Sequence, residues 1–147
     1  MSKKPLLALF LVVATELIGF GLIIPVLPQL ALTFQTSDFL IGILMASYSA
    51  AQFISAPLLG SLSDKFGRRP VLVISKFGSA FAYLLMALTQ SYWWFLAARC
   101  LDGFTGGNIS VARAYVSDTT TPENRPKGMA IIGIAFGTGF ILGPALG

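Results

Sequence analysis

Five long apolar segments follow one another along the chain, and they constrain its fold more than any other feature. A helix needs about 20 mostly apolar residues to cross a bilayer, and the segments are continuous rather than alternating, which favours helices over the strands of a membrane barrel. With 55% hydrophobic and only 11% charged residues, the chain cannot cover a water-facing surface as a soluble domain does. The sequence therefore predicts an all-α integral membrane protein, with helices at approximately residues 6–32, 39–62, 71–88, 92–116 and 127–147.

Several kinds of catalytic and metal site are excluded by the residue types that the chain lacks. It contains no histidine and a single cysteine, Cys100, so a Ser-His-Asp triad, a Cys-His pair and an internal disulfide are not available. A zinc site would lack its usual ligands. We therefore expect a protein that is not an enzyme, with no catalytic residues and no bound metal.

The basic residues lie only in alternate connections between the segments, and this predicts the orientation. They occur at Lys3 and Lys4, in the stretch SDKFGRRP and in the stretch TTTPENRPK, whereas the other two connections contain no Lys or Arg. Positively charged connections stay on the cytoplasmic side of a membrane. We therefore place the N-terminus in the cytoplasm, and this placement accounts for the net charge of +4 without a nucleic-acid partner.

The stretch GSLSDKFGRRP, between the second and third segments, contains more than a basic loop needs. A carboxylate lies beside three cations, and we expect Gly60 to allow close approach of a neighbouring helix and Gly67 to permit a turn. This stretch resembles the signature loop between helices 2 and 3 of the major facilitator superfamily. The matching residues, which the resemblance makes a cytoplasmic gating loop, are Gly60, Asp64, Lys65, Gly67, Arg68 and Arg69.

The resemblance also brings a more distant carboxylate into this loop. Asp118 ends the fourth segment on the same side of the membrane as Asp64 and Arg68. In the superfamily these helix ends lie together, so we expect one cluster of charge-assisted bonds that latches the outward-open state.

Two further stretches narrow the resemblance. ARCLDGFTGGNISVARAYVSD is similar to the arginine-containing helix 4 motif of proton-coupled antiporters, most of all the tetracycline-efflux group, although Asp102 and Arg113 replace residues that are usually small there. GTGFILGPALG resembles the helix 5 motif of antiporters. Its glycines recur every four residues, so they predict a packing seam against another helix, and its proline predicts a local bend. The residues of this motif are Gly139, Gly143, Pro144 and Gly147.

The resemblance implies an architecture of which the chain is one part. A superfamily member has two six-helix halves, and residues 1–147 correspond to a single transmembrane domain, the incomplete N-terminal six-helix bundle. It holds four full transmembrane helices and most of a fifth. We expect a fragment of a longer transporter, with a natural half-molecule as the alternative.

Charged residues inside the apolar segments are costly and usually functional. Glu16 lies about 15 Å into the first segment, near the middle of a core about 30 Å thick, and Asp102 lies at a similar depth. Arg99 shares a helix face with Asp102, so we predict that the two pair and that all three residues converge on a central polar cavity. Glu16 is the predicted proton or cation site, and a purely structural role is its alternative. We expect Lys76 and Arg113 to reach the cytoplasmic face.

Together these features predict a secondary active transporter of a bacterial inner membrane. By resemblance, it exports a small amphipathic molecule, such as a drug, in exchange for protons, with the proton gradient as energy source and no cofactor. Its expected partners are the lipid bilayer, the substrate, and the missing C-terminal helices or a second half. A metabolite uniporter or symporter of the same superfamily and a non-transporting half-transporter module are the alternatives.

Overall fold

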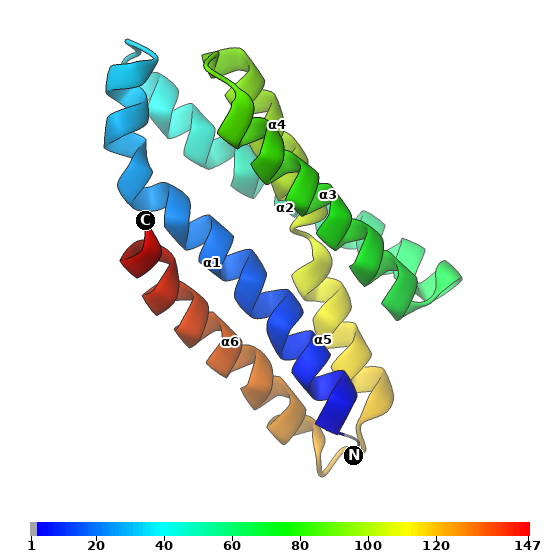
Figure 1. Cartoon of the computed structure of the whole chain (residues 1–147). Helices are drawn as coiled ribbons and strands as arrows, with labels where there is room; N and C mark the ends of the chain where they lie inside the picture. Colours follow the sequence, from blue (N-terminus) through cyan, green and yellow to red (C-terminus); the bar gives the residue numbers. More distant parts are fainter. Residues whose placement is uncertain (1–2) are drawn as a thin grey trace.

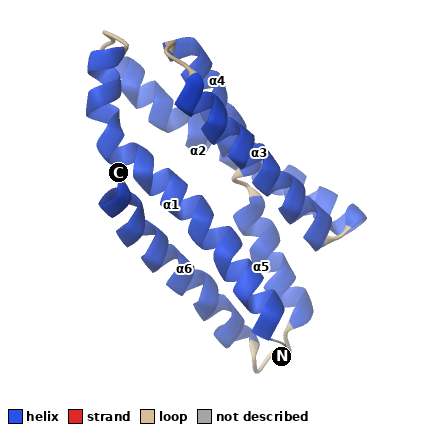
Figure 2. Ribbon diagram, in the orientation of Figure 1, coloured by secondary structure: helices blue, strands red, loops and turns tan. Residues whose placement is uncertain are grey.

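The apolar segments form long helices that are joined by short connections (Figures 1 and 2). A computed structural model describes residues 3–147. A helix of apolar residues pairs most of its backbone groups internally, so it suits a membrane interior. The six helices are α1 (Lys3–Thr33), α2 (Asp38–Phe66), α3 (Arg68–Leu88), α4 (Tyr92–Thr105), α5 (Asn108–Thr119) and α6 (Arg125–Leu146).

Four of the described helices have the length and composition of membrane spans. These are α1, α2, α3 and α6. Helices α4 and α5 have only 14 and 12 residues, fewer than the ~20 that a crossing needs. Because α5 follows α4 directly (Figure 1), we interpret the two together as the fourth crossing. The chain is therefore a multi-pass membrane protein with the predicted all-α fold.

The fourth crossing differs from the prediction of one helix over residues 92–116. The helix is interrupted at Gly106 and Gly107, two consecutive residues of very low helix propensity. The Gly106 carbonyl instead accepts a hydrogen bond from Gln52 Nε2 of α2 at 3.0 Å. The expectation of an unbroken helix was wrong because a side chain from a neighbouring helix satisfies the backbone at the interruption.

Helix α6 lies alongside α1 and runs in the same direction (Figure 1). The predicted glycine seam forms this contact: a side-chain carbon added to Gly143 would lie 2.7 Å from the Cα of Gly21, and one added to Gly147 would lie 2.8 Å from the carbonyl oxygen of Leu22. Gly139 meets Leu17 in the same way. The prediction of a close-packed seam is therefore confirmed, with α1 as the partner.

Pro144 lies inside α6, which continues to Leu146. Its ring packs over Gly21, where an added side-chain carbon would lie 3.0 Å from the proline Cδ. Pro144 therefore belongs to the contact with α1.

Two apolar clusters hold the remaining helices together. One joins α1, α3, α5 and α6, with Val13, Val111 and Ala135 fully buried. The other joins α1, α2, α3 and α4, with Leu44 and Ala98 fully buried. The buried charged side chains lie in α1 and α4, and buried polar side chains of α3 and α5 accompany them: Glu16, Arg99 and Asp102, with Ser79 and Asn108.

Candidate functional site

The candidate site is built around Glu16, which lies in the middle of α1 and is 1% exposed. Lys76 Nζ of α3 lies 2.6 Å from Glu16 Oε2. Asn108 Nδ2, at the start of α5, donates to the same oxygen at 3.3 Å, and Ser79 Oγ of α3 donates to it at 3.4 Å. Three donors from two other helices therefore converge on one buried carboxylate.

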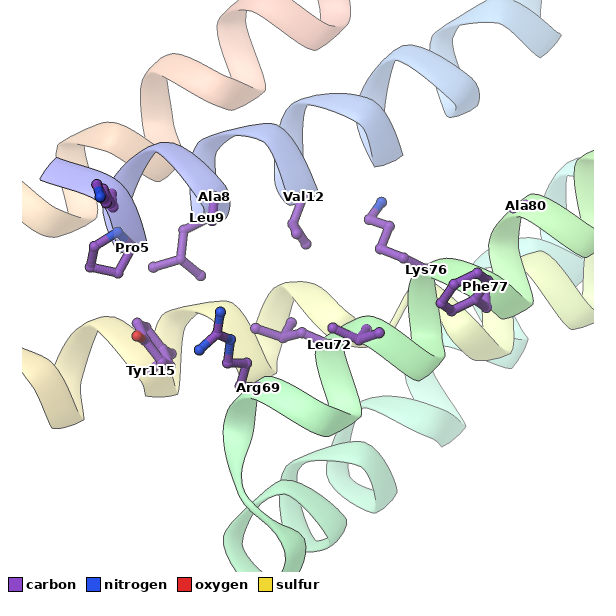
Figure 3. Close-up of a pocket in the computed structure, with 12 residues that line it drawn as sticks. Pro5, Ala8, Leu9, Val12, Arg69, Leu72, Lys76, Phe77, Ala80 and Tyr115 are labelled. Carbon is purple, nitrogen blue, oxygen red and sulfur yellow. The ribbon is translucent and has the colours of Figure 1, made fainter.

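The position of Lys76 corrects the prediction that it reaches the cytoplasmic face. Its side chain projects from α3 toward α1 (Figure 3) and is 25% exposed. The opposite charge of Glu16 is close by in a region of low dielectric, where attraction between charges is strong. This attraction holds the ammonium group inside the bundle, and sequence spacing alone did not reveal it.

Arg99 and Asp102 form a second buried ion pair, as predicted. Arg99 Nη1 lies 3.2 Å from Asp102 Oδ2, and both side chains are 0% exposed. The guanidinium carbon also lies 4.6 Å from the centre of the Tyr48 ring and 5.9 Å from that of Phe20. The aromatic faces therefore stabilise a cation that is removed from water.

The Arg99–Asp102 pair and Asn108 leave hydrogen-bonding capacity unused. Within residues 3–147, no protein partner reaches Nε or Nη2 of Arg99, Oδ1 of Asp102 or Oδ1 of Asn108, although all these atoms are buried. Buried polar atoms in proteins nearly always have a partner. The two Arg99 nitrogens can therefore donate, and the two oxygens can accept, hydrogen bonds with a solvent molecule or a polar group of a substrate.

The three residues that the sequence singled out lie in one polar layer, but in two ion pairs. Arg99 pairs with Asp102, and Glu16 pairs with Lys76. Sequence reasoning missed Lys76 as a member, although it is the single charged residue of the predicted segment 71–88 and carries the same signal as the others. It also missed Asn108, which only the interrupted fourth crossing brings to Glu16.

A cavity of about 430 Å³ lies between α2, the α4–α5 junction and α6. Gly106 and Gln52 line it. A side-chain carbon on Gly106 would lie 3.0 Å from Glu16 Oε1, so a single glycine separates the carboxylate from the cavity. Arg113 also lines this cavity and is exposed.

The predicted charge cluster at the α2–α3 connection is present. Arg68 Nη2 lies 2.5 Å from Asp64 Oδ1, and Arg68 Nε lies 2.9 Å from Asp118 Oδ2. One guanidinium thus joins the end of α2 to the end of α5. The other two cations of the loop stay outside this cluster: Lys65 lies over the Phe66 ring, and Arg69 lines a separate cavity.

The two glycines of this loop behave differently. Gly67 has φ +97°, a conformation that side chains rarely adopt, so the turn assigned to it is observed. Gly60 has open space where a side chain would lie. The close helix approach expected at Gly60 is not found on its side-chain side, although its carbonyl oxygen accepts a hydrogen bond from Arg68 Nη1 of α3 at 3.4 Å.

Metal binding gains no support from the described part of the chain. Within residues 3–147, no three His, Cys, Asp or Glu side chains lie together as possible metal ligands. The buried carboxylates are matched by Lys76 and Arg99 instead.

Comparison with known proteins identifies the relatives of this chain. The sequence profile of the Major Facilitator Superfamily matches residues 9–147. The tetracycline resistance protein class H of Pasteurella multocida is 41% identical over 99% of the chain, and that of class C from Escherichia coli is 40% identical over 99%. The chain spans only 37% and 38% of the length of these two relatives.

A solved structure gives the same assignment of fold. The crystal structure of the human organic anion transporter MFSD10 (TETRAN) matches with a TM-score of 0.87 and 33% sequence identity. The match covers 98% of this chain and 41% of the human chain.

Proposed function

The chain belongs to the Major Facilitator Superfamily, and from that premise we propose that it is part of a proton-coupled antiporter that exports a small amphipathic molecule such as a drug. The similarity to tetracycline resistance proteins over nearly the whole chain supports this proposal. The exported molecule is amphipathic because the site offers charged groups within apolar walls.

The observation that carries the proposal is the buried Glu16. A carboxylate in the middle of a membrane helix is costly unless it is neutralised, and here Lys76 neutralises it at 2.6 Å. A group of this kind can also be neutralised by a proton or by a cationic group of a substrate. Exchange among these partners is the chemical basis of coupled transport that we assign to Glu16.

The interrupted fourth crossing supplies the second part of the proposed site. Discontinuous helices near the bilayer midplane form the substrate sites of many secondary transporters, because their free backbone groups face a cavity. Asn108 lies at the start of α5 and bonds Glu16, and the Gly106 carbonyl faces Gln52. We assign the Arg99–Asp102 pair to the same site, as a control on the charge of Glu16.

We assign the cluster of Asp64, Arg68 and Asp118 to gating. It lies at the basic end of the bundle, which we place in the cytoplasm together with the N-terminus. In this proposal the bundle acts in the inner membrane of a bacterium, works with further helices that form a second half, and uses the proton gradient without a cofactor.

Substrate efflux from proteoliposomes under an imposed proton gradient tests the proposal, with the full-length transporter that contains this chain. Glu16→Gln keeps the size and hydrogen bonding of the side chain but cannot ionise, so we expect pH-driven export to be lost. Glu16→Asp is expected to keep part of the activity because a titratable group remains. The control is Asp38→Asn, which removes an exposed carboxylate at the start of α2.

A wild-type export rate with unchanged pH dependence in Glu16→Gln would make Glu16 a structural residue. The coupling group would then be Asp102 or a residue in the rest of the transporter. The amount of protein in the liposomes is measured for each variant, so that a loss of folding is not read as a loss of coupling.

A second candidate function is the transport of a metabolite by uniport or symport. The similarity to the human organic anion transporter MFSD10 favours it, and so does the position of Lys76, a cation that an organic anion would contact. The same vesicles separate the two functions: in antiport the substrate moves against the proton flow, and in symport it moves with it. A chain that moves no substrate in either direction would support the half-transporter module.

A further inference from the structure

A large cavity opens between α1 and α3, away from the α4–α5 junction (Figure 3). Its volume is about 800 Å³. We call it the α1–α3 cavity. Its walls are mostly apolar, with Leu9 and Val12 from α1 and Leu72 and Phe77 from α3. A ligand held here would need an apolar body.

The charges of the α1–α3 cavity are all positive. Lys4, Arg69 and Lys76 line it, and none of the described residues that line it carries a carboxylate. Arg69 and Lys76 are seven residues apart, nearly two helical turns, so they lie on one face of α3 about 10 Å from each other. Both side chains extend into the space between the helices (Figure 3). The cavity thus combines apolar walls with a row of cations.

Lys76 connects this cavity with the buried polar layer. Its ammonium group donates to Glu16 at 2.6 Å, yet a quarter of its side chain, 25%, remains exposed. An ammonium group has three N–H donors, so Lys76 can bond an anion in the cavity with the donors that Glu16 does not use. The Glu16 carboxylate therefore competes with a bound anion for the ammonium group of Lys76.

We propose that the α1–α3 cavity is a binding site for a small amphipathic anion, whose negative group is held by Lys76 and Arg69 and whose apolar body lies against Leu9, Val12, Leu72 and Phe77. Binding here does not depend on the direction of transport or on transport at all. The site is distinct from the 430 Å³ cavity beyond Gly106.

The shared cation makes anion binding sensitive to the charge of Glu16. When Glu16 binds a proton it no longer competes for Lys76, so a proton and the anion favour one another's binding, reciprocally. The other groups around Glu16 come from every helix packed near it. Lys76 and Ser79 of α3 and Asn108 of α5 bond it.

The remaining charged and titratable neighbours do not change this sign. Tyr48 of α2, Tyr83 of α3 and Asp102 of α4 lie within electrostatic range of Glu16. Asp102 and Arg99 neutralise each other at 3.2 Å. On α6 the described charged residues stand in its first turn, remote from the middle of α1. Lys76 is therefore the cation that becomes free to bind an anion when Glu16 is neutral.

Naphthalene-2-sulfonate is a suitable probe, because it is small, rigid and ionised at every working pH. Binding is measured by titration calorimetry on the protein in phosphatidylcholine nanodiscs, with empty nanodiscs as reference. Naphthalene-2-sulfonamide has nearly the same shape without the charge. We expect saturable binding of the sulfonate, at least about tenfold weaker binding of the sulfonamide, as for the loss of one charge-assisted bond, and tighter sulfonate binding in acidic buffer.

Four variants locate the site. Glu16→Gln frees Lys76 and should bind the sulfonate more tightly than the wild type, with no dependence on pH. Adding Lys76→Gln to Glu16→Gln leaves no unpaired carboxylate and should weaken binding about tenfold or more relative to Glu16→Gln. Replacing the same lysine by arginine in that background should keep the binding. Lys127→Gln removes a cation outside the cavity and should change nothing.

Two results would overturn the proposal. One is equal sulfonate affinity in Glu16→Gln and in the double variant Glu16→Gln/Lys76→Gln, which would place any binding elsewhere. The other is no saturable binding above that of empty nanodiscs.

Discussion

Lys76 Nζ and Glu16 Oε2, which come from helices α3 and α1, lie 2.6 Å apart inside the bundle. The other buried ion pair, Arg99 with Asp102, joins residues three positions apart within one helix. Formation of α4 alone brings the second pair together, whereas the first forms only when α1 and α3 pack. The Lys76–Glu16 pair therefore helps to fix the position of α3 against α1.

Removing Lys76 should destabilise the bundle. In Lys76→Met the buried carboxylate of Glu16 loses its cation, and breaking a buried ion pair costs about 3–5 kcal/mol. We expect a loss near the lower end, about 3 kcal/mol, because Lys76 is partly exposed. Thermal unfolding of the purified protein in detergent, followed by circular dichroism, measures the change.

The double variant Lys76→Met/Glu16→Gln is the matched control for this loss. It has no unpaired charge, so most of the lost stability should return. Equal stabilities of the single and double variants would show that Glu16 does not need its cation in the folded state.

Substitution in the glycine seam tests the contact between α1 and α6. In Gly143→Ala the added carbon would lie 2.7 Å from the backbone of Gly21, and backbone cannot move aside as a flexible side chain can. Overpacking of this kind costs about 1–3 kcal/mol. Gly137→Ala is the control, because open space surrounds Gly137 on the same helix, and it should leave stability unchanged or raise it by up to about 1 kcal/mol. Equal melting temperatures for the two variants would contradict the seam.

Much of the fold could be predicted from the sequence, because each apolar segment carries its own signal of length and composition. The glycine seam followed from a four-residue spacing, and the Arg99–Asp102 pair followed from a three-residue spacing on one helix. These features depend on a single helix. The break at Gly106 was missed because two glycines within an apolar run are compatible with a continuous membrane helix.

The residues that surround Glu16 were harder to predict, because their contacts depend on several helices rather than on one. The contacts of Glu16 with Lys76 and Asn108 span 60 and 92 residues of sequence, and only the packing of three helices brings them together. The open space at the side-chain position of Gly60 was not predicted, because a glycine in the sequence does not tell which of its sides faces a neighbouring helix. The cluster at Arg68 was predicted correctly because the resemblance places the two helix ends together.

Backbone conformation at the α2–α3 connection gives a third prediction. Gly67 has φ +97° and ψ 150°, a region that only glycine occupies easily, so Gly67→Ala should cost about 1–3 kcal/mol. Gly60→Ala places the same methyl group in open space and should be tolerated. Melting curves of the two variants in detergent test this prediction. A destabilised Gly60→Ala together with a stable Gly67→Ala would contradict the requirement for glycine at position 67.

The contact between Arg68 and Asp118 should matter for transport far more than for stability. Asp118 is 55% exposed, and an exposed ion pair contributes about 0–1 kcal/mol. Asp118→Asn should therefore lower the free energy of unfolding by no more than about 1 kcal/mol. The same substitution removes one of two carboxylates that hold Arg68 between the ends of α2 and α5, and a gating contact of this kind biases an equilibrium between states in which small energies suffice. We therefore expect Asp118→Asn to reduce the efflux rate in proteoliposomes while its melting curve stays close to that of the wild type.

Glu123→Gln is the control, because Glu123 is an exposed carboxylate in the α5–α6 connection that forms no ion pair within the described residues. If Asp118→Asn transports as fast as Glu123→Gln, the cluster at Arg68 is a surface ion pair without a role in gating.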